Sequence, residues 1–327
     1  MNLNLTKITF LMLMIFSTLM TISSSNWFSM WMGLELNLFS IIPIMNMKSS
    51  SIYTMESIMK YFLIQAFASI LLLLMLLFKS FYFMINTNFM MTIPLMIKLS
   101  LMPFHLWLPS MIEGLNWMVC FLMLTWQKIS PMILISYLII NKNLLFTIIL
   151  LSINSIFGMN QNSVRKIMAM SSINNSSWML IAIIINENLW LNYFMIYSII
   201  NMLIIIIFMK YNINYINQLK FFNLNFFFKL NILMLIFSLM GLPPMLGFLM
   251  KWMLIQNIIY LKLYSILIVL ITVTIMNLYF YLKMCYFLLF NFNIFNKWFM
   301  LNKKFNKYYS LIFINFLSLF INYMYLF

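Results

Sequence analysis

Residues 56–78, ESIMKYFLIQAFASILLLLMLLF, decide the fold class, because no charged residue follows Lys60 until Lys79. About 20 apolar residues in a helix, rising about 1.5 Å each, cross the roughly 30 Å hydrocarbon core of a bilayer. This stretch therefore predicts a membrane-spanning helix, and similar stretches recur from one end of the sequence to the other.

The composition of the whole chain agrees with a membrane location. Its 327 residues include 19 Lys and Arg, 4 acidic residues (all glutamate) and 65% apolar residues, and the mean hydropathy is +1.02. The water-facing surface of a soluble domain cannot be assembled from so few charges, so a soluble globular fold is excluded. The composition predicts an all-α polytopic membrane protein, organised as a single integral membrane domain over residues 1–327.

Apolar runs separated by charged or Asn-rich breaks predict eleven transmembrane helices. Prolines interrupt the fourth of these spans and the segment that follows it. The predicted spans are residues 3–22, 27–46, 56–78, 84–104, 115–140, 144–159, 164–186, 189–209, 230–256, 263–287 and 309–326.

The basic residues between these spans fall mostly on one side of the membrane. Thirteen Lys and Arg side chains lie on one side, and only Lys79, Lys142 and Lys262 lie on the other. The positive-inside rule then predicts that the N-terminus lies on the cytoplasm-equivalent side and the C-terminus on the opposite side.

The amino-acid usage bears on the location of the protein. Residues with GC-rich codons are scarce, with 5 Gly and 7 Pro, whereas the chain has 36 Met. An AT-rich genome in which a second codon is read as Met would produce this bias, although Met also serves as a soft filler of membrane helices. The bias favours an animal mitochondrial gene, which predicts the inner membrane, with the N-terminus in the matrix and the C-terminus in the intermembrane space.

Two other features of the composition predict no site. The net charge of +15 is spread thinly over the loops, so we expect no nucleic-acid binding. Cys120 and Cys285 lie inside apolar runs without CxxC spacing or a histidine partner. They are predicted to be buried thiols rather than a disulfide or a metal site.

Four charged residues lie deep inside predicted spans, each several residues from the helix end: Glu35, Lys98, Lys128 and Lys251. A charge at the bilayer centre costs roughly 2.5 to 3.5 kcal/mol, so four of them cost on the order of 10 kcal/mol, which pairing, hydration or neutralisation must offset. Glu35 is predicted to pair with Lys98, forming a site that loads and releases a proton as the pair closes and separates. The alternatives are a fixed buried ion pair and lysines that snorkel to the interface.

Two polar interruptions predict two discontinuous helices, a pattern typical of ion-coupled transporters. In the span 230–256, Gly241, Pro243 and Pro244 must break the backbone hydrogen-bond ladder, which predicts a polar cavity beside Lys251. The run SSINNSS at 171–177 contains Ser172 and Asn175 and places water-holding side chains in the middle of another span. A simple kink is the alternative at both places.

The remaining titratable residues lie near predicted helix ends. His105, in PFHLWLP at 103–109, is either a proton relay or a structural histidine that caps a turn near the interface. Glu56 and Lys60 are four residues apart, the spacing of an interfacial ion pair on one helix. Glu113 and Glu187 are expected to face water.

Six motifs, taken in order along the chain, are similar to one family. They resemble the antiporter-like membrane-arm subunits of mitochondrial NADH:ubiquinone oxidoreductase (respiratory complex I), in particular the animal chain 2 family, over residues from about 27 to 256. From 263 onward the resemblance extends only to hydropathy. The motifs are WMGLELN at 31–37, KYFLIQA at 60–66, Lys98 before PFHLWLP at 103–109, TWQK at 125–128, RKI at 165–167, and GLPP at 241–244 with Gly247-Phe248 and Lys251-Trp252.

The resemblance implies an antiporter-like bundle of eleven helices, with a core at about 27–256 and C-terminal helices in 263–327. Such a subunit pumps protons but holds no redox centre. NAD, FMN, iron–sulfur clusters and ubiquinone would bind elsewhere in the complex, so no cofactor or metal is expected in this chain. The implied partners are other membrane-arm subunits of complex I and lipids such as cardiolipin.

The resemblance also implies roles for the four buried charges. Glu35 would be the coupling carboxylate, Lys98 its partner, Lys128 the central relay, and Lys251 the group toward the exit side. The sequence departs from the family at Asn175, where a histidine is common, and at Ser110, where an acidic residue is common. Because Asn cannot carry a proton, a relay at Asn175 would need water.

Two other classes of function remain open at this point. One is a stand-alone cation/proton antiporter of related ancestry. The other is a structural membrane scaffold whose buried charges have no function.

Overall fold

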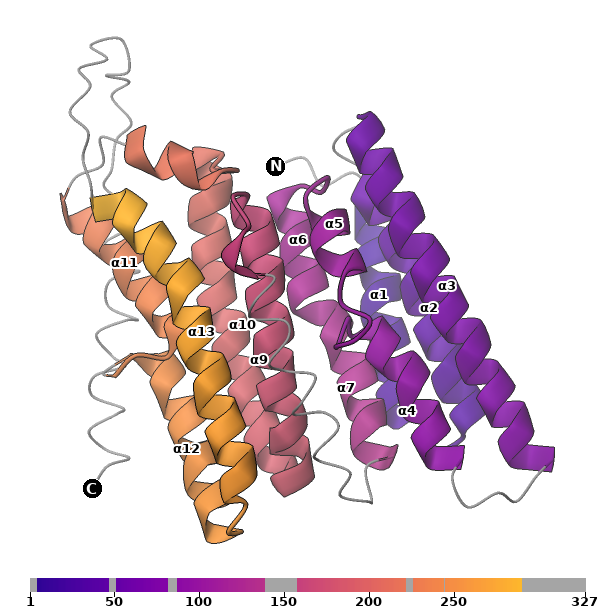
Figure 1. The fold of residues 1–327 in the computed structure, drawn as a ribbon. Helices are drawn as coiled ribbons and strands as arrows, with labels where there is room; N and C mark the ends of the chain where they lie inside the picture. Colours follow the sequence, from indigo (N-terminus) through magenta and orange to yellow (C-terminus); the bar gives the residue numbers. More distant parts are fainter. Residues whose placement is uncertain are drawn as a thin grey trace.

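The computed structural model describes residues 5–46, 51–81, 87–138, 158–221, 226–243 and 245–289, and within these ranges the regular structure is helical (Figure 1). The helices run roughly side by side. They are α1 (Leu5–Ser23), α2 (Trp27–Asn46), α3 (Ile52–Phe81), α4 (Thr87–Lys98), α5 (Trp107–Ile112), α6 (Trp117–Leu124), α7 (Trp126–Leu138), α9 (Val164–Ile185), α10 (Glu187–Tyr211), the 3-10 helix η1 (Ile216–Phe221), α11 (Phe226–Met240), α12 (Leu246–Tyr260) and α13 (Tyr264–Leu289).

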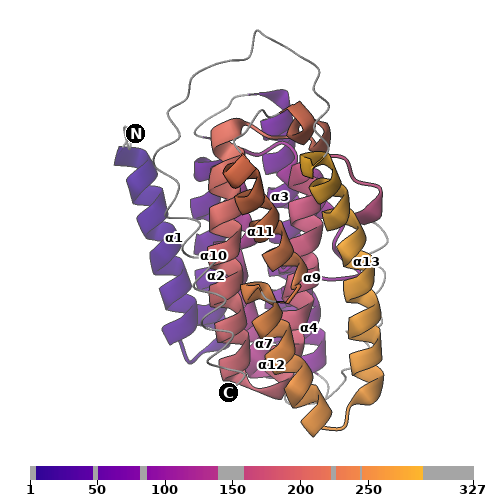
Figure 2. The ribbon, with the colours of Figure 1, turned by 90° about the vertical axis from the view of Figure 1, so that its left-hand side faces the viewer.

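Helix α9 lies at the centre of the bundle. It packs against α5, α6, α7, α10 and α12, and nearly all of its side chains are buried. Helices α1 to α4 pack on one another in sequence on one side. Figure 2 shows α1 and α13 on opposite flanks, with α9 and α10 between them. A side chain that projects from the middle of α9 is therefore kept away from lipid.

Most of the predicted spans are confirmed. Of the helices that the structure describes, seven, counting α6 with α7 as one, are long and apolar enough to cross a membrane. The predicted span 84–104 is shorter than expected, because α4 ends at Lys98 and residues 99–106 are not helical. The predicted span 309–326 and nearly all of 144–159 lie outside the described residues.

The predicted interruption at Gly241 is confirmed, because α11 ends at Met240 and α12 begins at Leu246. Gly241 has a φ of +76°, a conformation that glycine adopts readily and other residues rarely adopt. Pro243 lies exposed in this turn, and Pro244 lies outside the described residues.

The predicted break at 171–177 is wrong, because α9 is continuous from Val164 to Ile185. The hydroxyl groups of Ser171, Ser172, Ser176 and Ser177 each donate a hydrogen bond to the carbonyl oxygen three residues earlier. These bonds satisfy the serine side chains without opening the backbone.

The second discontinuity lies instead at Thr125, between α6 and α7. Thr125 has φ −119° and ψ −74°, far from the roughly −63° and −42° of a regular α-helix. Its N–H and its hydroxyl both donate to the carbonyl oxygen of Phe121, and this type of back-bonding bends helices. The fold therefore has two discontinuous helices, but one of them was expected elsewhere.

Charged side chains gather at one end of the bundle. Arg165 and Lys166, at the start of α9, contact Glu113, which follows α5, through a hydrogen bond of 2.8 Å to its carbonyl oxygen and an ion pair of 2.6 Å. Lys283, near the end of α13, donates to Asn162 at the same end. Lys79 lies at the far end of α3, over the ring of Trp27 at 5.5 Å. We call the end that carries Arg165, Lys166 and Lys283 the basic end.

Candidate functional site

Lys98 and Lys128 line the same internal cavity. Both side chains are buried, with 8% and 3% of their surfaces exposed. Lys98 is the last residue of α4, and Lys128 is the third residue of α7, directly after the break at Thr125. The cavity between them is also lined by polar side chains: Asn37, Tyr61, Gln65, Ser100, Gln127 and Ser130.

Two amides beside this cavity are joined by reciprocal hydrogen bonds. Asn37 Nδ2 donates to Gln127 Oε1 at 2.9 Å, and Gln127 Nε2 donates to Asn37 Oδ1 at 3.0 Å. This pair fixes α2, which carries Glu35, to α7, which carries Lys128.

The Lys128 ammonium is held by the main chain of α9. Its Nζ donates a hydrogen bond of 2.7 Å to the carbonyl oxygen of Ser172. It also lies 5.9 Å from the ring centroid of Tyr197 on α10, within the range of a cation–π contact.

Lys251 is held in a similar way at the break between α11 and α12. Its Nζ donates a hydrogen bond of 2.7 Å to the carbonyl oxygen of Met240, the last residue of α11. The side chain passes so close to Gly241 that an added Cβ there would lie 2.8 Å from Nζ. A side chain at position 241 would therefore collide with this lysine, so the break requires glycine there.

A second cavity adjoins Lys251. Part of its lining is polar, formed by Lys251, Ser238, Asn175, Tyr193 and Tyr197, and the rest is apolar apart from Gly247. Tyr197 therefore contacts Lys128 with its ring and lines the cavity of Lys251. Lys98, the first cavity, Lys128, Tyr197, the second cavity and Lys251 thus follow one another through the bundle, and we call this series the path.

Each lysine of this path lies next to the C-terminal end of a helix. Helix α4 ends at Lys98, α6 ends at Leu124 just before Lys128, and α11 ends at Met240 beside Lys251. The C-terminal end of a helix carries unpaired carbonyl groups and partial negative charge, which favour a cation. In transporters such interrupted helices commonly hold coupling ions.

Glu35 lies on α2 near the Lys98 end of the path. Its Oε1 is buried without a hydrogen-bond partner among the residues that the structure describes. Glu35 acts electrostatically on Lys98, but in the described part of the chain no ion pair within 4 Å joins them. A closed Glu35–Lys98 pair is therefore not the state of this structure.

Ser172 and Asn175 belong to the site, although they break no helix. Ser172 supplies the oxygen that binds Lys128. Asn175 Oδ1 accepts a hydrogen bond of 2.8 Å from the hydroxyl of Tyr193. Asn174, one residue earlier, bonds to Asn277 of α13 at 2.6 Å on another face of α9.

His105 has the geometry expected of a histidine that caps a turn. It is buried in the non-helical segment before α5, and its Nδ1 lies 3.3 Å from the carbonyl oxygen of Pro103. It does not line either of the two cavities.

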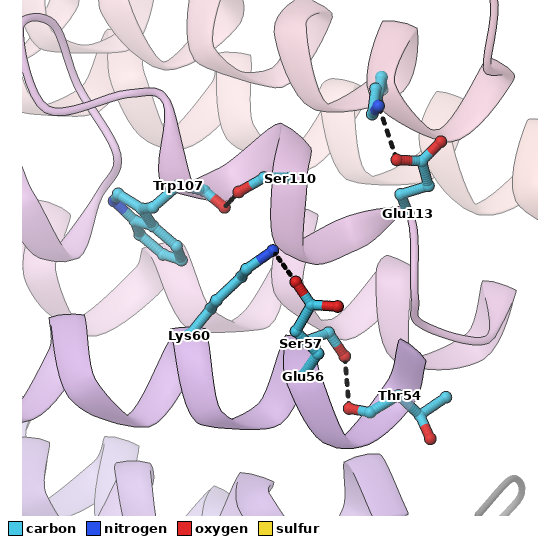
Figure 3. Close-up of polar contacts among 8 residues, drawn as sticks. Thr54, Glu56, Ser57, Lys60, Trp107, Ser110 and Glu113 are labelled. Carbon is cyan, nitrogen blue, oxygen red and sulfur yellow. Dashed lines mark hydrogen bonds and ion pairs between the residues drawn. The ribbon is translucent and has the colours of Figure 1, made fainter. Parts of the chain in front are cut away.

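The predicted Glu56–Lys60 pair is confirmed, with an N–O distance of 2.6 Å and both side chains partly exposed (Figure 3). Lys60 faces the short helix α5, which carries Ser110 (Figure 3). Ser110 donates to the carbonyl oxygen of Trp107 at 2.9 Å (Figure 3). Cys120 and Cys285 are buried and free, as expected.

Several residues of the path were not predicted from the sequence, because they are uncharged. Tyr193, Tyr197 and Asn201 are spaced four residues apart, which places them on one face of α10. That polar row within an otherwise apolar span was the available signal. Asn37 and Gln127, each within two residues of a buried charge, carried a similar signal.

Lysines held inside the bundle at helix ends, beside two cavities with polar lining residues, are typical of a membrane protein of the ion-translocating, antiporter-like class. A family described as "NADH:quinone oxidoreductase/Mrp antiporter, TM" matches residues 24–278. The fold is similar to that of a chain in respiratory complex I from Thermus thermophilus, with a TM-score of 0.77 at 18% identity, covering 87% of this chain and 71% of that one.

Comparison with animal proteins identifies a narrower family within this class. NADH-ubiquinone oxidoreductase chain 2 of Anopheles gambiae is 42% identical over 95% of this chain and 94% of its own length. The protein of the same name from Aedes aegypti is 43% identical over 95% and 94%. The chain belongs to the NADH-ubiquinone oxidoreductase chain 2 family.

Proposed function

We propose that this chain is the proton-translocating, antiporter-like subunit of the membrane arm of mitochondrial respiratory complex I. In this assembly NADH-to-ubiquinone electron transfer drives proton pumping. The observation that carries the proposal is that Lys98 and Lys128 line one cavity, Lys251 lines a second, and Tyr197, which lines the second cavity, has its ring beside Lys128. Ionisable residues placed in this way inside a membrane protein are typical of proton relays.

The proposed path gives each charged group one task. Glu35 is the coupling carboxylate, which receives the signal from a neighbouring subunit and pairs with Lys98 in one state of the cycle. Lys128 passes protons between the two cavities, and Lys251 serves the exit side. Asn175 cannot carry a proton, so it would orient water or Tyr193 between Lys128 and Lys251.

The proposal includes the surroundings of the chain. It lies in the mitochondrial inner membrane, with its N-terminus and basic end in the matrix and its C-terminus in the intermembrane space. Its partners are other membrane-arm subunits and lipids such as cardiolipin, and residues 1–327 form one integral membrane domain. NAD, FMN, iron–sulfur clusters and ubiquinone bind to other parts of the complex, and this chain holds no cofactor.

The test is Lys128→Met in the assembled complex, reconstituted into lipid vesicles. Met keeps the length of the side chain and removes its exchangeable protons. We expect normal assembly and at least about tenfold slower coupled proton translocation, since a positioned acid–base group typically contributes two or more orders of magnitude. Lys60→Met, which removes a partly exposed ion pair, is the matched control and should behave as wild type.

The same variant separates the other two classes of function. A stand-alone antiporter would exchange cations for protons in vesicles without the rest of the complex and would lose this activity with Lys128→Met. A scaffold would lose stability but translocate protons at the wild-type ratio to electrons. Migration of the chain within a large NADH-oxidising assembly on a native gel would also contradict the stand-alone function.

A further inference from the structure

Helix α10 carries a small group of buried polar atoms with no task in the path described above. They are Oη of Tyr197 and both polar side-chain atoms of Asn201, Oδ1 and Nδ2. Tyr197 is 4% exposed and Asn201 is 1% exposed, and none of the three atoms has a hydrogen-bond partner among the described residues. Because burying an unpaired polar group is costly, three such atoms together indicate a bound ligand.

The arrangement of these atoms suits water. Tyr197 and Asn201 are four residues apart and lie one above the other on the same face of α10. The Tyr197 hydroxyl faces the side chains of Asn201 and Ser172 but does not reach hydrogen-bonding geometry with either. Water molecules bridge gaps of this kind when several polar groups surround them.

Lys128 lies beside this group. Its ammonium has three N–H groups, and one of them donates to Ser172. The nitrogen is 5.9 Å from the ring centroid of Tyr197, so Tyr197 is the member of the group that lies beside the lysine.

The group extends from Tyr197 toward the basic end. Helix α10 runs from Glu187 toward that end (Figure 1), so Asn201 is one turn closer to it than Tyr197. Farther along the same helix, Ile205 and Phe208 are buried and apolar. Phe208 packs on Trp117 with ring centroids 5.4 Å apart, and Arg165 of the basic end lies 5.3 Å from the Trp117 ring.

We propose that Tyr197 and Asn201 bind water molecules that connect Lys128 with the basic end, forming a proton-uptake branch that the Trp117–Phe208 contact closes in this structure. Each water accepts one proton and releases one, and the neutral amine of Lys128 is the final acceptor. Tyr197 can pass a proton through its hydroxyl group, whereas Asn201 positions water without titrating. The inference rests on the proposed function, since it assigns a route to the same relay.

The first test is a cryo-EM map of the assembled wild-type complex, sharp enough to resolve ordered water inside the membrane arm. We expect water density at about 2.7 to 3.2 Å from Tyr197 Oη and from the Asn201 amide. A map that resolves other buried waters but has none here, or that has the Asn201 amide bonded directly to protein, would overturn the proposal. This test requires no variant to fold.

The second test uses Asn201→Leu in the same complex, with Asn201→Ser as the conservative variant that still holds water. We expect coupled turnover about tenfold lower for Asn201→Leu and within about twofold of wild type for Asn201→Ser. Asn192→Leu, the same change at an exposed position of α10, should match wild type. Equal losses in the Leu and Ser variants at 201 would overturn the branch, because they would indicate a packing defect.

Lys128→Met measured alongside separates the two proposals. If Lys128→Met impairs translocation and Asn201→Leu does not, the branch is wrong and the proposed function stands. If both match wild type, the proposed function itself fails.

Discussion

Lys128 donates a 2.7 Å hydrogen bond to the carbonyl oxygen of Ser172, in the middle of the continuous helix α9. A carbonyl oxygen has two lone pairs, so this one can bind the ammonium and keep its place in the helix. When Lys128 no longer donates to it, the Ser172 carbonyl oxygen keeps its helical hydrogen bond. The lysine can therefore change state without unfolding the helix that holds it.

Glu35→Gln is expected to lower the number of protons pumped per NADH oxidised. Gln has the same shape as Glu but cannot take up a proton or attract Lys98 as a charge. The ratio should be measured in vesicles that contain the assembled complex, with Glu56→Gln as a control for loss of a carboxylate near the surface. A full wild-type ratio in Glu35→Gln would remove Glu35 from the coupling path.

Two substitutions of Lys251 should separate its structural role from its proton-carrying role. Lys251→Gln can still donate to the Met240 carbonyl oxygen but cannot titrate, so it should assemble normally and pump at least about tenfold more slowly. Lys251→Met should pump equally slowly and also lose about 1 to 3 kcal/mol of stability, because the carbonyl is left unpaired. Thermal inactivation compared with proton flux gives both readouts, and wild-type flux in Lys251→Gln would contradict the assignment.

Gly247→Ala should destabilise the turn between α11 and α12. An added Cβ at this position would overlap the carbonyl oxygen of Ser238, which cannot move without opening the end of α11. We expect a cost of about 1 to 3 kcal/mol, typical of overpacking, seen as a lower temperature of thermal inactivation. Gly158→Ala, whose Cβ would lie 3.2 Å from the Phe280 ring, should cost less, and the reverse order would contradict the described break.

The Asn37–Gln127 pair can be tested by a double-mutant cycle. Asn37→Leu and Gln127→Leu should each cost about 1 to 3 kcal/mol, because Asn37 is buried and Gln127 half-buried, and each change leaves the other amide unpaired. The double variant should cost clearly less than the sum of the two. Additive costs in thermal inactivation would mean that the two amides do not stabilise each other.

The parts of the fold that depend on hydropathy and proline could be predicted from sequence. The interruption at Gly241 followed from adjacent helix-breaking residues, and it lies beside Lys251 as expected. The break at Thr125 carries no such residue, and its back-bonded hydroxyl becomes visible only when the backbone is seen. The serines of α9 were misjudged because a serine can satisfy itself on its own helix, which composition does not reveal.

The candidate site was predictable as a set of charges but not as a path. Glu35, Lys98, Lys128 and Lys251 were identified because charges are costly in a membrane. Their connections depend on neutral groups such as Tyr197, which are common in membrane helices and gain meaning only from the helices that face them. The distance between Glu35 and Lys98 depends on how α2 and α4 pack, and the sequence does not encode it locally.

Lys128 and Lys251 each donate to a main-chain oxygen. Mutation of the residues that supply these two oxygens therefore does not remove the hydrogen-bond acceptor. No point mutation can delete a carbonyl group, so substitutions at Ser172 or Met240 that preserve the helix would leave the acceptor atom in place. Substitutions of the side chains around the two lysines would therefore leave their main-chain anchors in place.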